Sequence, residues 1–141
     1  MSDNTGIEWT DATWNVVTGC TKVSPGCEHC YAEFLAVKRR KLPVWGPPST
    51  TTRKRTAQPW KDLPAWDAAA RRDGVRQRVF CASMADAFED HPILGNERLR
   101  LWKLIEVTPA LDWLLLTKRP ENINDMVPEH WRNVNRWPAN V

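Results

Sequence analysis

The fold of this 141-residue chain follows from a segment near its start, Thr13-Trp-Asn-Val-Val-Thr-Gly-Cys-Thr-Lys-Val-Ser-Pro-Gly-Cys-Glu-His-Cys-Tyr31. Its first residues alternate aromatic, β-branched and polar types up to Thr18-Gly19, which is typical of a short strand that ends in a turn. Three cysteines follow. From Tyr31 to Lys41, apolar residues recur at helical spacing until Pro43 ends the pattern. The order is therefore strand, cysteine loop, helix.

The cysteine loop carries Cys20, Cys27 and Cys30 within eleven residues, and the chain has only one other cysteine, Cys81. Structural zinc sites use four protein ligands, whereas a catalytic metal centre keeps one position open. A four-iron cluster takes one thiolate per iron, so three cysteines leave one iron free. The turn at 25–26 would bring Cys20 back towards the other two thiols. The loop indicates a metal centre.

Spacing alone leaves two kinds of metal centre open. One is an iron–sulfur cluster on the three cysteines. The other is a zinc site that His29, Cys81 or His91 completes. A disulfide framework is disfavoured, because the chain is longer than small secreted scaffolds and shows no signal peptide.

The rest of the chain predicts alternating helices and strands. The expected elements are a helix at 62–72 that Gly74 ends, a strand at 78–83, a helix at 96–107 capped by Asn96, a strand at 112–117 and a short helix at 121–126. The segments between the strands are too long for hairpins, so the strands should run parallel with crossover helices. The sequence predicts an α/β fold in a single domain, 1–141.

Polar side chains gather where the predicted strands end. The cysteines follow the first strand, Ser83 and Asp86 follow the second, and Thr117, Lys118 and Arg119 follow the third. Ligands of parallel sheets bind at the carboxyl ends of the strands. We therefore expect one shared site built from three loops.

Positive charge concentrates between Lys38 and Arg78, where twelve Lys or Arg residues face three Asp. Within it, residues 42–59 lack periodicity and predict a long basic surface loop. Arg53, Lys54 and Arg55 of this loop are candidates for contact with nucleic acid or another partner. The cationic run 38–41 has a second interpretation, the solvated end of a helix.

No apolar stretch approaches the roughly 20 residues of a membrane span. The longest, Leu111 to Leu116, is interrupted by Asp112. We expect a soluble, cytoplasmic protein without membrane contact.

Four segments carry a family resemblance. They are Ile7-Glu-Trp-Thr-Asp-Ala-Thr-Trp-Asn15, the cysteine loop Gly19 to Glu33, Val79 to Glu89, and Leu114-Leu-Leu-Thr-Lys-Arg-Pro-Glu-Asn122. Together they resemble a phage-associated, three-cysteine family of radical S-adenosylmethionine-like proteins whose substrate is unassigned. The resemblance covers nearly the whole chain, and its cysteine spacing is wider than that of most radical enzymes.

The resemblance implies a partial (β/α) barrel of about three parallel strands. It implies a 4Fe-4S cluster on Cys20, Cys27 and Cys30, with S-adenosylmethionine on the free iron and cleavage to a 5′-deoxyadenosyl radical. The remaining cofactor-binding residues would be His29 near the adenine, Ser83 and Asp86 at the methionine amino group, and Lys118 or Arg119 at its carboxylate.

Relatives in this family continue past Val141, so we expect a truncated chain that represents an N-terminal half-barrel. A second chain could complete it, and without that half part of the substrate site would be missing. The expected function is that of a radical enzyme-like phage protein in the host cytoplasm, acting on a nucleotide or nucleic acid. The alternative is a zinc-stabilised or cofactor-free module that contacts a host protein or nucleic acid through its basic segment.

Overall fold

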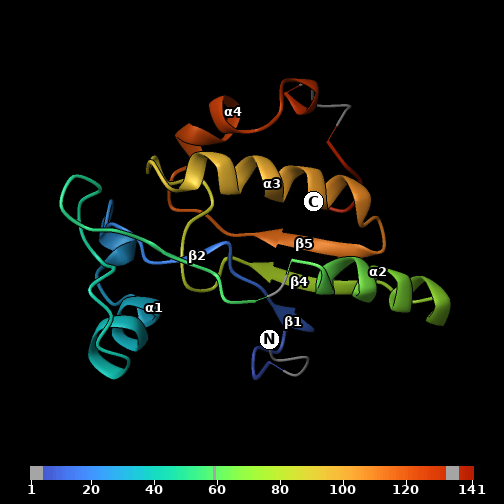
Figure 1. The fold of residues 1–141 in the computed structure, drawn as a ribbon, viewed down its shortest axis with the longest axis horizontal. Coiled ribbons are helices and arrows are strands. Elements are labelled where there is room, and N and C mark those ends of the chain that lie inside the picture. Colours follow the sequence, from blue (N-terminus) through green and yellow to red (C-terminus); the bar gives the residue numbers. More distant parts are fainter. Residues whose placement is uncertain (1–4, 59, 133–136) are drawn as a thin grey trace.

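A three-stranded parallel sheet forms the centre of the computed structural model, which describes residues 5–58, 60–132 and 137–141 (Figure 1). Its strands are β1 (Ala12–Thr13), β4 (Gln77–Cys81) and β5 (Leu111–Leu115), in the order β1-β4-β5. Both neighbouring pairs are parallel. The mixed α/β architecture with parallel strands is confirmed, and the described strands form no closed barrel.

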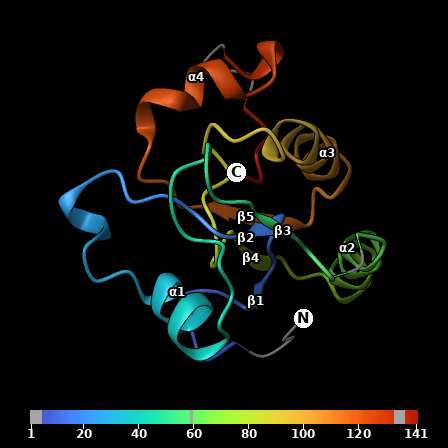
Figure 2. The ribbon, with the colours of Figure 1, turned by 60° about the vertical axis from the view of Figure 1, so that its left-hand side comes forward.

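Two crossover helices cover one face of this sheet. Helix α2 (Asp62–Asp73) precedes β4, and α3 (Leu94–Val107) precedes β5. Figure 2 shows α2 and α3 on one side of the strands and α1 (Tyr31–Glu33) on the other. The core between sheet and helices contains Val79 and Trp113, and both are fully buried. Because side chains alternate along a strand, Phe80 points to the opposite face, where it lines a cavity.

The two long helices lie close to their predicted ranges. Gly74 ends α2 in the left-handed conformation, with φ 66°, as a glycine at this position commonly does. Helix α3 begins two residues before Asn96, and the prediction of an Asn96 cap is wrong. The amide of Leu94 donates to the His91 carbonyl at 2.9 Å, so the turn at 91–94 starts the helix. None of the described helices is long and apolar enough to cross a membrane.

The first predicted strand is split into two short pieces. After β1 the chain forms β2 (Val17–Thr18), which pairs antiparallel with β3 (Lys54–Arg55). The prediction of a long basic surface loop at 42–59 is therefore wrong in part, because the segment contains β3 and buries Val44. Pro59 lies outside the described residues.

The cysteine loop contains a short 3-10 turn, η1 (Pro25–Cys27), and leads into α1. The helix predicted at 31–41 continues from α1 as a wider π-helix, η2 (Phe34–Arg39). Its buried side chains, Ala32 and Ala36, form a second small core with Val44 and Met84. This cluster anchors the cysteine loop on the open side of the sheet.

The C-terminal segment folds back over α3. It forms η3 (Pro120–Asn122), α4 (Ile123–Met126) and η4 (Glu129–Trp131). The indole of Trp102 donates to the Met126 carbonyl at 2.8 Å. The amide of Trp113 donates to the Asn140 carbonyl at 2.7 Å, so Asn140 lies beside the outer edge of β5.

The conformation of Gly19 yields a stability prediction. Its φ is +123°, and a Cβ there would lie 2.3 Å from the Val44 carbonyl oxygen. We expect Gly19→Ala to lower the free energy of unfolding by roughly 3 kcal/mol or more in urea titrations. The control is Gly95→Ala in α3, where a Cβ meets nothing within 4 Å and a gain of about 0.5–1 kcal/mol is expected. Equal changes in the unfolding free energy of the two variants would contradict the close approach of Gly19 to Val44.

Candidate functional site

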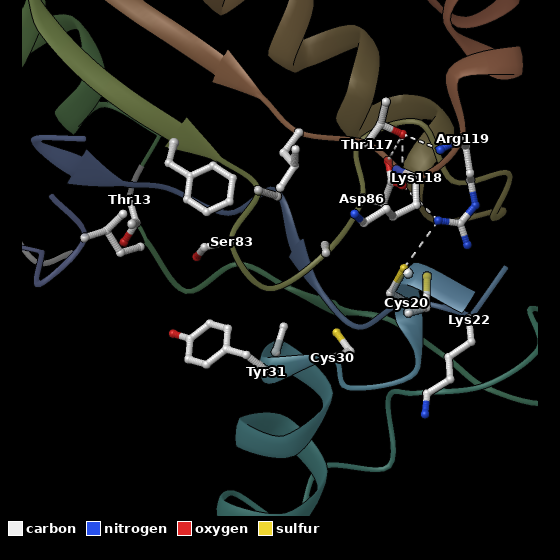
Figure 3. Close-up of a pocket in the computed structure, with 18 of the residues that line it drawn as sticks. Thr13, Cys20, Lys22, Cys30, Tyr31, Ser83, Asp86, Thr117, Lys118 and Arg119 are labelled. Atoms are coloured by element: carbon white, nitrogen blue, oxygen red, sulfur yellow. Dashed lines mark hydrogen bonds and ion pairs between the residues drawn. The ribbon is translucent and has the colours of Figure 1, made fainter. Parts of the chain in front are cut away.

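A cavity of about 830 Å³ lies at the carboxyl ends of the sheet strands (Figure 3). The three loops that were expected to share a site all line it. They contribute the cysteines after β2, Ser83 and Asp86 after β4, and residues 117–119 after β5. Aromatic side chains, Trp9, Phe80 and Tyr31, line the same cavity.

Backbone contacts hold the cysteine loop against the end of β4. The Gly19 amide donates to the Met84 carbonyl at 2.9 Å, and Gly19 forms a parallel bridge with Ala85. Cys20 follows directly and is half-buried, Cys27 is buried in η1, and Cys30 is half-buried at the start of α1. All three cysteines line the cavity, so the loop presents three free thiols to one space.

The surroundings of Cys20 and Cys27 shift the pKa values of their thiols in opposite directions. Burial, together with the Glu89 carboxylate, raises the pKa of Cys20 to about 11. Burial acts to raise the pKa of Cys27 too, but backbone hydrogen bonds from Val23 and Ser24 outweigh it, and that pKa is lowered. The Ser24 hydroxyl adds a further contact at 3.8 Å from the Cys27 sulfur. The loop therefore supplies the sulfur of Cys27 with polar donors.

Asp86 joins the ends of β4 and β5. Its carboxylate accepts hydrogen bonds from the Thr117 hydroxyl at 2.9 Å, the Lys118 amide at 3.1 Å and the Phe88 amide at 2.9 Å. It also pairs with the Arg119 guanidinium at 2.9 Å. Asp86 is 4% exposed, so these protein groups satisfy most of its acceptor capacity.

Arg119 connects this carboxylate to the cysteine loop. Its Nη1 donates to the Cys20 sulfur at 3.4 Å, and its Nη2 donates to the Thr21 carbonyl at 2.7 Å. Nη2 also lies 3.4 Å from a Glu89 oxygen. Figure 3 shows Arg119 above Cys20 with the dashed contact between them. A buried cation thus stands against a cysteine sulfur.

Arg53 occupies the interior, and its prediction as a nucleic-acid contact is wrong. Its guanidinium forms a two-bond pair with Glu89, both bonds at 2.8 Å, and the Arg53 side chain is 0% exposed. It also donates to the Thr21 hydroxyl at 2.8 Å and the Val44 carbonyl at 3.1 Å. The neighbouring candidates Lys54 and Arg55 are exposed on β3, and Arg55 pairs with Glu97 at 3.0 Å.

The other predicted cofactor residues have different positions. Ser83 lines the cavity, and the Asn15 amide donates to its hydroxyl at 3.0 Å. Lys118 is exposed on the cavity wall beside Gly26 of the cysteine loop. His29 is exposed and lies outside the described cavity lining. The structure places Ser83, Asp86 and Lys118 in the same cavity as the cysteines. His29 is a neighbour of Cys30 in the sequence but does not line the cavity.

No group of three or more His, Cys, Asp or Glu residues in the described part of the chain is placed to hold a metal ion. Of the three candidates for a fourth zinc ligand, His29 is exposed, and His91 and Cys81 have other surroundings. His91 bonds to the Thr51 carbonyl and the Ile93 amide. Cys81 is fully buried in β4, and burial raises its pKa to about 12.

Glu89 and the buried role of Arg53 were missed by the sequence reasoning. Neither residue lies in a sequence pattern that indicates burial. They pair only because the 42–59 segment crosses over the end of β4. The acidic Asp86-Ala-Phe-Glu89 run directly after a buried strand was the one available signal.

Comparison with known proteins places the chain in a family. Residues 4–141 match the model of a family described as protein of unknown function (DUF5131). The chain belongs to the DUF5131 family. No curated protein and no solved structure matches this DUF5131 chain.

The thiol environments of the DUF5131 chain predict an order of reactivity. In metal-free protein, the alkylation rate of Cys27 should reach half its plateau below pH 9, because its pKa is lowered from the ordinary value of 9.0. Cys20 should reach it only near pH 11. Mass spectrometry of alkylated peptides across pH measures both. A Cys20 midpoint below that of Cys27 would contradict the described surroundings.

The Arg53–Glu89 pair predicts a large loss of stability on charge removal. Glu89→Gln leaves two buried guanidinium groups without their shared carboxylate, so unfolding free energy should fall by about 3–5 kcal/mol. The matched control is Glu97→Gln, which removes the partner of the exposed Arg55 and should cost about 0–1 kcal/mol. Urea denaturation followed by circular dichroism measures both variants. Similar losses would show that the buried network does not hold the site together.

Proposed function

We propose that this chain binds a 4Fe-4S cluster through Cys20, Cys27 and Cys30 and belongs to the radical S-adenosylmethionine proteins. The observation that carries the proposal is the cavity at the carboxyl ends of the parallel strands, which all three cysteines line. Cys81, the one other cysteine, is buried in β4. A three-thiolate set would leave one iron open to S-adenosylmethionine.

A single zinc ion and a four-iron cluster require different spacings between the three thiols. Thiolates that share one zinc lie about 2.3 Å from it and so crowd together. Thiolates of a four-iron cluster bind different irons and lie farther apart. The distances among the three sulfurs would therefore distinguish a single ion from a cluster.

We propose further that the sheet is part of a (β/α) barrel. The strand order β1-β4-β5 follows the chain without reversal, and both crossover helices lie on one side (Figure 2). In a barrel the opposite face turns inward, and here that face lines the cavity. The outer edge of β5, where Asn140 already bonds, is where a further parallel strand from this or a second chain would add.

The chain's own residues bind and orient in this proposal. When bound, the cluster would supply one electron for cleavage of S-adenosylmethionine. Arg119 would place a cation beside the Cys20 sulfur, which offsets negative charge on the thiolate. Ser83 and Lys118 reach the cavity and are proposed to contact the amino-acid part of S-adenosylmethionine. Asp86 is proposed to act chiefly by fixing Arg119 and residue 118.

The proposal keeps the phage association and the host cytoplasm that the resemblance implies. Its alternative is a binding module that uses zinc or no cofactor. The two differ in metal content, so one preparation distinguishes them.

Reconstitution tests the cluster directly. Anaerobically reconstituted protein should contain about four irons and four sulfides per chain and show broad visible absorption. Cys27→Ala should lose the cluster because one iron loses its thiolate. Cys81→Ala is the matched control and should retain it, since Cys81 faces the helices.

Three results would contradict the proposal. They are one tightly held zinc in protein purified without added iron, no iron uptake, and equal iron loss in the Cys27 and Cys81 variants. Far-ultraviolet circular dichroism of both variants establishes that each remains folded.

A further inference from the structure

The exposed side of α1 and η2, together with the two residues that follow η2, combines flat aromatic rings with cations. Tyr31 is 60% exposed and Phe34 is 51% exposed, although both rings are large. Residues 38–41, Lys-Arg-Arg-Lys, follow on the same segment and are all exposed. We call Tyr31, Phe34 and residues 38–41 the basic aromatic surface.

The cations of this surface form no ion pair in the described part of the chain. Among residues 5–58, 60–132 and 137–141, no carboxylate lies within ion-pair distance of the side chains at 38–41. Elsewhere in the basic segment, exposed arginines are neutralised by an Asp or Glu, as are Arg55, Arg71, Arg72, Arg76 and Arg78. Among the described residues of the basic segment, the cations without an ion pair are residues 38–41, Lys54 and Lys61, so most of the unbalanced charge lies at the end of this helix.

The two rings and one cation, Arg39, lie in a row that begins at the cavity. Tyr31 lines the cavity (Figure 3), and Phe34 lies one turn farther along. The Arg39 guanidinium lies 5.7 Å from the centre of the Phe34 ring, which places the next cation over the second ring. Across the cavity, Trp9 is 49% exposed and lies 4.7 Å from the Phe80 ring.

The apolar side of the helix is already occupied. Ala32 and Ala36 are buried against Val44 and Met84. A helix that inserts into a lipid surface needs a free apolar face, so the exposed face suits another ligand. Proteins bind single-stranded nucleic acid by combining cations for the phosphates with aromatic rings on which bases stack. The basic aromatic surface supplies both.

We infer that the basic aromatic surface binds single-stranded nucleic acid and leads it to the cavity. As a statement about the substrate class, this inference rests on the proposed function. Binding itself needs no cluster, because none of the surface residues is a proposed ligand.

Fluorescence anisotropy with labelled single-stranded DNA and RNA of one mixed sequence tests the inference on the full chain. Tyr31→Ala and Phe34→Ala should each weaken binding at least about fivefold, the loss of one stacked base. Leu99→Ala is the matched control for an exposed apolar side chain on α3 and should not change affinity.

Salt dependence tests the cations. Arg39→Gln with Arg40→Gln should reduce the slope of log affinity against log salt by about 1.4, at about 0.7 per phosphate of a single strand. The control, Arg72→Gln with Lys103→Gln, removes the same charge from α2 and α3, on the other side of the strands, and should leave the slope unchanged.

The inference is overturned by any of three results. They are no binding of either strand at low salt, equal weakening by the control pair, and equal or tighter binding to the matching duplex or to anionic phosphatidylserine vesicles. Thermal melts of every variant show whether it folds. Binding by a chain that takes up no iron on reconstitution would refute only the proposed function, and a reconstituted cluster without binding would refute only this inference.

Discussion

A buried chain of alternating charges, Arg53–Glu89–Arg119–Asp86, is the constraint on which the site depends. It joins the segment before β3, the loop after β4 and the loop after β5. Removing such charges from water is costly, and only close pairing with further hydrogen bonds compensates. The three loops must therefore close together, and the cysteine loop closes with them because both arginines bond to Thr21.

The same network determines the electrostatics around the thiols. The two carboxylates and the two guanidinium groups of the network sum to zero net charge. A negatively charged ligand at Cys20 would therefore lie beside Arg119 in a neutral network. Arg119 donates to the Cys20 sulfur and to Asp86 from one nitrogen. Cys27, by contrast, receives its donors from its own turn. Cys20 and Cys27 therefore have different hydrogen-bond donors, although both belong to one loop.

Periodicity and turn residues predicted the parallel strands, α2 and α3, because these elements depend on local patterns. The three polar loops were brought together for the same reason, since parallel strands end at one edge. The pairing of β2 with β3, the burial of Arg53 and the start of α3 before Asn96 could not be predicted. Each depends on contacts between distant segments, and nothing in Thr51-Thr-Arg-Lys-Arg55 indicates which arginine turns inward.

In the proposed function, the three cysteines hold a cluster with one open iron. The most direct measurement is electron paramagnetic resonance of the reduced, reconstituted chain with and without S-adenosylmethionine. Direct binding to the open iron predicts that the cluster signal changes its g-values when S-adenosylmethionine is added. Identical spectra at saturating S-adenosylmethionine, or a signal that survives the Cys27→Ala substitution, would contradict the claim.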